Sequence, residues 1–520
     1  MPVDSVDQMV IDTLKERLGD RAEKADQDFL RRVADMGSER LGRYKTALEY
    51  YEGEKGALLT DRAKTFLQRS GLPYGENYCS TVVDALAERL AVVGVTTDLA
   101  EKDAETGEES DALGEWLWDT FDQNRGDETQ ATVHSESLKY GDGFVLVDFN
   151  PDRGIPRLTW NSPTLVLPFY EDGVLAYCSK VWNTTAKSPT NPSGKPIRRL
   201  NIYYPHKVEK WFSMASDSEG AQWVEWLDDG DSVWPTPWIG KDGAPLGVPV
   251  FHFRNMRTAD LGQAEHWQSI PQQDLLNKQL VDLSNVMDHQ GFPQRWALGV
   301  SDTSSLTTDP GVVWTSENTT AQFGQFAAAD PGGLLKAVES TLIRIATRSR
   351  TPAHLVYLSG GLPSGESLKT AESGLVAKVK NRQIYFGGVW SEVFRMAAMV
   401  ADTFGAPAET PPVHLPELRA LSLNVRWQDP ETRNEKEHLD ALTVMSALGV
   451  SKETILSMIP GIDPAEEEEK KARAMPDIGE AGNNLMDLAT TNPPEVLPQA
   501  GEKPAIPAKG GQFKAKQGGK

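Results

Sequence analysis

Apolar residues recur at helical spacing over much of the first 120 positions. Val10, Leu14 and Leu18 begin the pattern, and the segments 77–90 and 113–121 repeat it with apolar residues three or four apart. A glycine at position 53 follows the pattern Leu-Glu-Tyr-Tyr-Glu, as expected where a helix ends. The sequence therefore predicts an N-terminal region built mainly from amphipathic helices.

The pattern changes to that of β-strands between residues 143 and 253. Runs of β-branched and aromatic residues are separated by turn sequences such as Asp172-Gly173 and Asp242-Gly243. The predicted strands are 144–149, 165–170, 174–178, 197–204, 208–212 and 248–253. We predict a largely antiparallel sheet. Four tryptophans within this region could form a ligand-stacking platform, but packing of the sheet explains them better; they are Trp223, Trp226, Trp234 and Trp238.

Helical periodicity returns from about residue 263. The first helix, 263–290, carries an apolar stripe with spacings of four, three and four, typical of helix packing; the stripe is Leu276, Leu280, Leu283 and Met287. Residues 291–331 are predicted to be β and loop, with strands at 294–300 and 311–315. A second helix is predicted at 333–350, and Thr351-Pro352 ends it.

A glycine-rich loop separates this helix from a much longer one. The long helix is predicted to begin near Ser364 and to reach Phe404, about 60 Å at 1.5 Å per residue. Two shorter helices are predicted at 433–447 and 451–459, separated by Gly449, and the Pro- and Gly-rich stretch beyond residue 477 is predicted to be flexible. These patterns together predict an α+β protein of three to four domains.

Charge and cysteine content narrow the classes of protein. The formal net charge is −22, which argues against nonspecific nucleic-acid binding through a broad basic surface. Two explanations of the negative charge stay open: it keeps the protein soluble, or it repels phosphate so that a duplex slides past a like-charged wall. Cys79 and Cys178 are far apart, so we expect neither a disulfide framework nor a zinc site, and a reducing compartment fits. We find no signal peptide and no apolar run of membrane-spanning length.

Motifs for catalysis are not found in the sequence. The loop glycines 360, 361 and 365 lack the following Lys-Ser/Thr of a phosphate-binding loop, and Gly194-Lys195 is followed by proline. The eight histidines are isolated from one another and from cysteine, as expected of packing or surface residues. We therefore expect no catalytic residues, no cofactor and no metal.

Several blocks, in this order, resemble the portal proteins of tailed bacteriophages, in particular the siphophage-type portal family. The blocks are 50–53, 77–94, 249–255, 270–278, 294–299, 362–368 and 440–449. The order and spacing of the blocks carry the likeness, which covers roughly residues 40–475, because no single block is as specific as a metal motif.

The resemblance implies the portal fold and a division of the chain into its parts. The implied parts are a wing (1–260), a stem helix (261–290), a clip (291–331), a second stem helix (332–350), a tunnel loop (351–366), a long wing helix with its return (367–430), a helical crown (431–475) and a flexible tail (476–520). The loop residues that would face DNA are Tyr357, Leu358, Ser359, Gly360, Gly361, Leu362, Pro363, Ser364 and Gly365, and the clip contacts would be Arg295, Trp296 and Trp314.

The resemblance also implies partners and a location. The chain would form a ring of twelve copies around double-stranded DNA, at one capsid vertex of the virion, after assembly in the host cytoplasm. It would contact the terminase large subunit, the major capsid protein, a scaffolding protein and a head-completion adaptor, with no membrane involved. Two other classes stay open: an enzyme acting during particle assembly, which would need a constellation that the sequence does not show, and a scaffold without a channel.

Overall fold

The computed structural model divides the chain into two compact units, residues 1–431 and 432–520. It describes residues 24–54, 65, 75–99, 101–102, 109–185, 196–213, 222–226, 233–256, 260–291, 295–300, 306, 313–326, 330–357, 365–406, 410–431, 442–450 and 455. Both helices and antiparallel strands are present in the first unit, as the predicted α+β class requires.

The described part of the N-terminal region is helical, as its periodicity predicts, while the start of the pattern at residues 10–18 lies outside the described residues. Its helices are α2 (Lys24–Ala34), α3 (Ser38–Glu52), α5 (Cys79–Ala87), α6 (Ala112–Gln123) and α7 (Gly126–Tyr140). Helix α3 ends at Gly53, whose φ of 74° is left-handed, and this confirms the predicted helix end. Helix α6 begins after Asp111, whose side chain accepts a hydrogen bond from the backbone N–H of Gly114.

The strands form several sheets, and every pair among the described strands is antiparallel. A three-stranded sheet has the order β12-β4-β5, and a larger sheet has the order β10-β9-β8-β7-β6, with β11 on β9. Their bounds are β4 (Asp142–Asn150), β5 (Ile155–Asn161), β6 (Val166–Glu171), β7 (Val174–Thr184), β8 (Ile197–Tyr203), β9 (Lys207–Ser213), β10 (Val224–Glu225), β11 (Thr236–Pro237) and β12 (Val250–Arg254). The predicted antiparallel region is confirmed.

Three short strand pairs complete the strand content of the described chain. Strand β1 (Val92–Thr97) pairs with β15 (Leu423–Trp427), which brings segments more than 320 residues apart side by side. Strands β2 (Glu101–Lys102) and β3 (Glu109–Ser110) form a small pair. Strands β13 (Arg295–Leu298) and β14 (Gln322–Gln325) form a hairpin.

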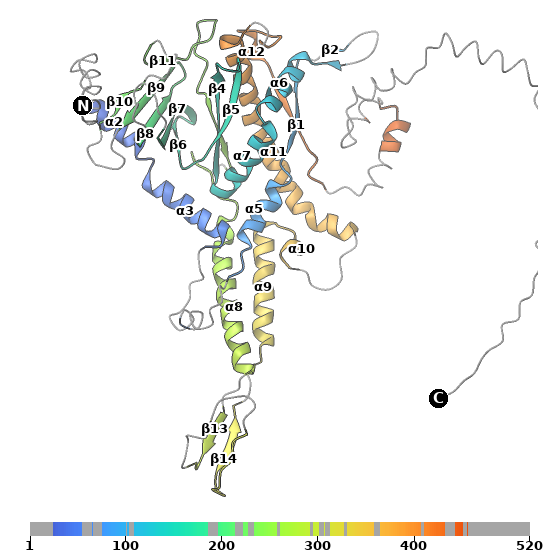
Figure 1. Ribbon diagram of the computed structural model, residues 1–520. Coiled ribbons are helices and arrows are strands. Elements are labelled where there is room, and N and C mark those ends of the chain that lie inside the picture. Colours follow the sequence, from blue (N-terminus) through green and yellow to red (C-terminus); the bar gives the residue numbers. More distant parts are fainter. Residues whose placement is uncertain are drawn as a thin grey trace, which may run out of the picture. The chain divides into compact units, whose positions relative to one another are not determined.

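The largest core lies where helix α11 (Gly365–Phe404) crosses the three-stranded sheet, with α7 beside it (Figure 1). Trp390 is fully buried there, and its ring meets Phe253 at 5.1 Å between centroids. The indole Nε1 of Trp390 donates a hydrogen bond to His134 Nε2 at 2.9 Å. The polar edge of this tryptophan is therefore satisfied without water, as a buried indole requires.

A second core lies between α2 and the larger sheet. Val33 from the helix packs in one cluster with Leu200 and Trp223. Gln27 donates to and accepts from the backbone of Trp223, which fixes the helix against this edge. Trp226 and Trp238 are also buried, while Trp234 donates from Nε1 to the carbonyl of Lys210. The interpretation of these tryptophans as packing residues is confirmed.

One predicted strand is wrong. Residues 313–315 are not in a strand, and the partner of β13 is β14, at Gln322–Gln325. Trp296 pairs with Gly324 in this register, and a Cβ at that position would collide with the Trp296 ring. The Trp296 ring therefore needs a glycine opposite it. This requirement explains why Gln322–Gln325 is the partner of β13, although its strand propensity is lower than that of the Val-Val-Trp run.

The second unit contributes a short described helix, residues 442–447. It ends at Gly449, with a φ of 84°, and the backbone N–H of Val450 donates to Met445 while that of Gly449 donates to Ser446. This double hydrogen bond is the Schellman arrangement, so the predicted helix end at Gly449 is confirmed.

Candidate functional site

Two helices of similar length pack antiparallel at the centre of the candidate site. They are α8 (Ile270–Gly291), which follows a short 3-10 turn η2 (Trp267–Ser269), and α9 (Gly332–Ser349), and both lie where the sequence predicts helices. Figure 1 shows the pair projecting from the rest of the first unit, with the β13–β14 hairpin at its far end. The β13–β14 hairpin lies within the connection between the two helices, residues 292–331, and α9 returns along α8.

The apolar stripe of α8 is buried at one end and exposed at the other. Leu276 is fully buried in a cluster with Val338 and Ile345 of α9, and Leu280 packs against the same cluster. Leu283 is buried as well, but Met287 is 57% exposed. Three of the four members of the predicted stripe therefore pack within the chain, and the last member, Met287, faces solvent in the single chain.

The hairpin brings the three predicted clip residues close together. The Arg295 guanidinium lies over the Trp314 ring, 5.6 Å from its centroid. Trp314 in turn lies 6.2 Å from the Phe323 ring, and Trp296 covers Gly324. Cation–π and ring contacts thus supply packing for this small pair of strands, which joins no larger sheet among the described strands.

The glycine-rich loop is anchored at its start. Helix α10 (Ala353–Val356) follows α9, and the Tyr357 hydroxyl donates to Glu339 Oε1 of α9 at 2.7 Å. The predicted loop residues 358–364 lie outside the described residues, and Gly365 is the first residue of α11. Of the predicted loop positions, the structure thus places Tyr357 against the helix pair.

A buried ion cluster joins the start of the helix pair to α11. Glu265 Oε1 lies 2.5 Å from Lys378 Nζ, and Glu265 Oε2 lies 3.0 Å from Arg382 Nη2. Asn255 Oδ1 accepts from Arg382 Nε at 2.5 Å, and Lys378 also donates to the carbonyl of Ser349 at 2.5 Å. Four separate segments, at residues 255, 265, 349 and 378–382, therefore share one hydrogen-bonded cluster.

Electrostatics explain why the carboxylate in this cluster remains charged. Burial opposes ionisation of Glu265, but the adjacent cations Lys378 and Arg382 outweigh burial and hold the pKa of its carboxyl below the usual value. Removing one partner of such a cluster leaves an uncompensated buried charge, which is strongly unfavourable. We infer that the cluster fixes the position of α11 relative to the first turns of α8.

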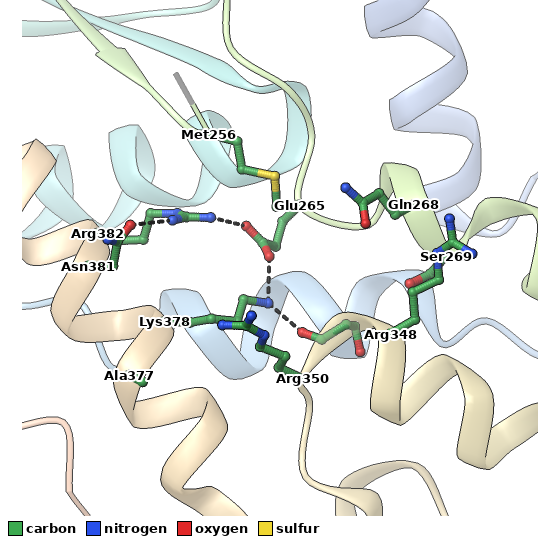
Figure 2. Close-up of a pocket in the computed structure, with 11 residues that line it drawn as sticks. Met256, Glu265, Gln268, Ser269, Arg348, Arg350, Ala377, Lys378, Asn381 and Arg382 are labelled. Carbon is green, nitrogen blue, oxygen red and sulfur yellow. Dashed lines mark hydrogen bonds and ion pairs between the residues drawn. The ribbon is translucent and has the colours of Figure 1, made fainter. Parts of the chain in front are cut away.

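A cavity of about 400 Å³ opens beside this cluster (Figure 2). Lys378 and Arg382 reach Glu265 from α11, while Arg348 and Arg350 contribute from the end of α9. The remaining lining residues are Met256, Gln268, Ser269, Ser349, Ala377 and Asn381. The lining is rich in cations and poor in apolar side chains, unlike most sites for small organic ligands.

A second buried polar network ties α3 to both large sheets. Asp142 is fully buried and accepts from the Tyr44 hydroxyl at 2.7 Å; it also lies 2.7 Å from His252 Nε2. His252 Nδ1 lies 2.9 Å from the Tyr170 hydroxyl on β6. Burial lowers the pKa of His252, although Asp142 opposes this. The set resembles a catalytic relay in composition, but its members are hydrogen-bonded to one another within the core.

Neither network is among the residues singled out from the sequence. A signal did exist for the first: Lys378 and Arg382 are four residues apart in α11, in the same stripe as the buried Leu375, Val379 and Phe386. Two cations in an otherwise apolar helical stripe indicate a buried acidic partner. The identity of that partner, Glu265, has no comparable local signal.

Other chemistry is not visible in the parts of the chain that the structure describes. No group of three or more His, Cys, Asp or Glu among those residues is placed to hold a metal. No helix among them combines the length and apolarity needed to cross a bilayer. Cys79 and Cys178 are both buried free thiols, and burial raises the pKa of Cys79 to about 12.

Comparison with known proteins gives the class to which this arrangement belongs. The model of a phage portal protein family, described as SPP1 Gp6-like, matches residues 30–477. The portal protein of Mycobacterium phage L5 is 23% identical over 499 residues, covering 89% of this chain and 92% of that protein. The portal protein of Mycobacterium phage D29 is 23% identical over 427 residues, covering 77% of this chain and 78% of that protein.

The family match spans most of the chain, so this protein belongs to the SPP1 Gp6-like family of phage portal proteins. It is a structural component of a tailed-phage virion. The resemblance seen in the sequence blocks is thereby confirmed.

Proposed function

We propose that the chain is one subunit of a ring of twelve that encloses a channel for double-stranded DNA. In this reading, residues 1–260 form the wing, 261–290 and 332–350 the stem, and 291–331 the clip. The tunnel loop is 351–366, the long wing helix and its return 367–430, the crown 431–475 and the tail 476–520. The observation that carries the proposal is the projecting α8–α9 pair with its terminal hairpin, in a chain of the portal family.

Exposed apolar side chains on the helix pair support assembly into a ring. Met287 is joined on the pair by Leu275, Leu335 and Ile343, all large apolar residues exposed in the single chain. Single exposed apolar residues are common, but a projecting helix pair that carries several of them is typical of a surface covered by another chain. Head-to-tail contacts between identical copies close a cyclic ring, in which each pair lies beside two others.

DNA would pass through the channel without sequence-specific contacts. A portal must pass an entire genome, so readout of base edges would hinder its work. The formal net charge of −22 fits a wall that repels phosphate and does not retain the duplex. The loop from Tyr357 to Gly365 would approach the DNA, and its first residue, Tyr357, donates a hydrogen bond to Glu339 of α9.

Assembly in the host cytoplasm would bring several protein partners to different parts of the chain. The clip residues Arg295, Trp296 and Trp314 would contact the terminase large subunit during packaging and a head-completion adaptor afterwards. The wing would contact the major capsid protein and a scaffolding protein. Energy for packaging would come from the terminase, and the portal itself would need no cofactor, metal or membrane.

Deletion of Ser359–Gly365 tests the role of the loop. We expect rings to form normally but DNA packaging in a reconstituted assembly reaction to fall strongly, because the loop would face DNA. A matched control lacks the last seven residues of the chain, 514–520, and should package DNA normally. Loss of ring formation in the first variant would show that the loop is an assembly element and would contradict the proposed role.

A further inference from the structure

The cavity between α9 and α11 carries a large excess of positive charge. Four of its lining side chains are cationic, namely Arg348, Arg350, Lys378 and Arg382, and one is a carboxylate, Glu265. Lys378 and Arg382 are buried on its floor and already bond Glu265. The two other arginines are exposed, and we call this solvent-facing side of the cavity its mouth. Figure 2 shows all four cationic side chains from α9 and α11 around the same space.

Several polar groups that line this cavity have no partner among the described residues. The side chains of Arg348 and Arg350 form no hydrogen bond or ion pair with any residue that the structure describes. Ser269 is 1% exposed and lines the same cavity, and its hydroxyl has no hydrogen-bond partner among those residues. A buried hydroxyl without a partner is unfavourable unless a ligand supplies one.

Arg350 is the C-terminal cap of α9. Its φ of 55° lies in the left-handed region that non-glycine residues rarely adopt. The backbone N–H of Arg350 donates to the Thr347 carbonyl and that of Thr351 donates to the Ala346 carbonyl, as in an ordinary helix cap. The cap places Arg350 in the lining of the cavity.

An oxyanion is the ligand chemistry that this lining fits, since two arginines present planar donor groups to carboxylate or phosphate. The phosphates of duplex DNA are poorly suited. B-DNA is stiff over about 150 base pairs, so its backbone cannot bend into a recess with a buried floor. A firm phosphate contact would also retain DNA that must move. A single protruding side chain can enter the recess. Carboxylates are plentiful on other copies of this chain, which has 75 acidic residues against 53 basic ones.

We propose that the pocket formed by α9, α11 and residues 265–269 receives an aspartate or glutamate side chain from a second copy of this chain. The contact would link each α9–α11 junction to the adjacent subunit, next to the start of the glycine-rich loop. This inference rests on the proposed ring, and it adds an electrostatic contact to the apolar one on the helix pair.

Charge reversal at the mouth tests the contact. The double variant Arg348→Glu, Arg350→Glu changes exposed side chains only, so the unassembled chain should keep its melting temperature. We expect the protein concentration needed for half-assembly, followed by native mass, to rise about tenfold or more, because a desolvated charge pair is replaced by repulsion. The double variant Arg31→Glu, Arg32→Glu is the matched control, since it reverses two charges at exposed positions of α2, away from both the helix pair and the cavity.

A chemical cross-link identifies the partner. Arg350→Lys keeps the charge and supplies an amine that a carbodiimide can join to a nearby carboxylate. In rings mixed from ¹⁴N- and ¹⁵N-labelled chains, we expect peptides joined between one label and the other. If this amine joins only Glu265 of its own chain, the inference is wrong.

The outcomes separate the inference from the proposed function. If native rings form and the double variant assembles equally well, the pocket contact is wrong and the ring stands. If assembly is unchanged while the variant rings bind a duplex oligonucleotide more weakly at low salt, the pocket holds phosphate and the inference is again wrong. If the native chain forms no ring, both the inference and the proposed function fail.

Discussion

The core beneath α11 and the far end of the α8–α9 pair differ in how completely a single chain satisfies them. In the core, Trp390, Phe386 and Phe253 are buried from solvent, and the indole N–H has its partner in His134. At the far end of the pair and on the hairpin, Met287 is 57% and Leu298 60% exposed. In the first region, the apolar side chains are buried and the indole N–H is hydrogen-bonded within the chain. In the second region, large apolar side chains remain exposed to solvent in the single chain.

This difference in burial separates the residues that should determine folding stability from those that should affect assembly. Side chains of the core should determine whether the chain folds, while those at the far end should change little until copies associate. The buried Glu265 cluster lies between these regions and belongs energetically to the core, because all three of its charged members are buried.

Truncation of the core tryptophan has the largest expected effect. Trp390→Ala removes a fully buried ring and leaves His134 Nε2 without its donor, so we expect a loss of about 4–5 kcal/mol in the free energy of unfolding. Urea denaturation of the unassembled chain measures it. Ile384→Ala, at a 74% exposed position of the same helix, should cost less than about 0.5 kcal/mol; equal losses would contradict the assignment of the core.

Removal of the buried carboxylate comes next. Glu265→Ala leaves Lys378 and Arg382 buried without their counter-ion, and we expect a loss of about 3–4 kcal/mol in the free energy of unfolding. The control Glu392→Ala removes a carboxylate whose side chain is 56% exposed, and its loss should be close to zero. A stable Glu265→Ala variant would show that the cluster does not hold α11 in place.

Acid should weaken the core through a buried histidine. Burial lowers the pKa of His134 to about 4, although its hydrogen bond to the Leu90 carbonyl opposes this. The unfolded chain binds a proton near pH 6.5 and the folded chain does not, so this contribution is present above pH 6.5 and is lost as pH falls towards 4. We expect stability to drop by about 2 kcal/mol between pH 7 and pH 5 from His134.

The measurement is urea denaturation at both pH values, with His134→Gln as the comparison. The glutamine variant is less stable at pH 7 because it cannot reproduce both hydrogen bonds, but it should lose less stability on acidification. An identical pH dependence in the two proteins would assign the titration to other groups.

Polar substitution on the hairpin has the smallest expected effect on folding. Leu298→Ser and Phe326→Ser alter side chains that are each 60% exposed, so we expect the unassembled chain to lose less than about 0.5 kcal/mol. The same variants should weaken ring formation or terminase binding, measured by native mass and by co-sedimentation. A large drop in melting temperature of the single chain would show that the hairpin is part of the core instead.

Periodicity predicted most of the helices, because their apolar stripes are local in sequence. Helices α8, α9 and α11 lie where the stripes place them, and Gly53 and Gly449 end helices as their conformational freedom suggests. The strand at 322–325 escaped prediction because its place depends on Trp296 across the hairpin and not on its own residues. Pairing between distant segments carries no local pattern.

The candidate site was less predictable from the sequence than the helices were. The stripe from Leu276 to Met287 marks the helix pair, but its exposed end became visible only when each side chain was placed. The Glu265 cluster joins residues more than 110 positions apart, and the cavity beside it is lined by side chains from α9, α11 and residues 265–269. Long-range charge pairing of this kind is decided by tertiary packing, which composition and spacing do not encode.

Electron microscopy of the purified chain, together with its native mass, tests directly whether twelve copies form a ring around a channel. We predict end-on views of a ring with a central hole, with a mass of about 690 kDa for twelve chains of 57.2 kDa. Twelve-fold class averages would establish that the incomplete surface of the helix pair is covered by identical copies. A monomer or dimer, under conditions in which other portal proteins assemble and with a scaffolding partner supplied, would contradict the account and favour a scaffold without a channel.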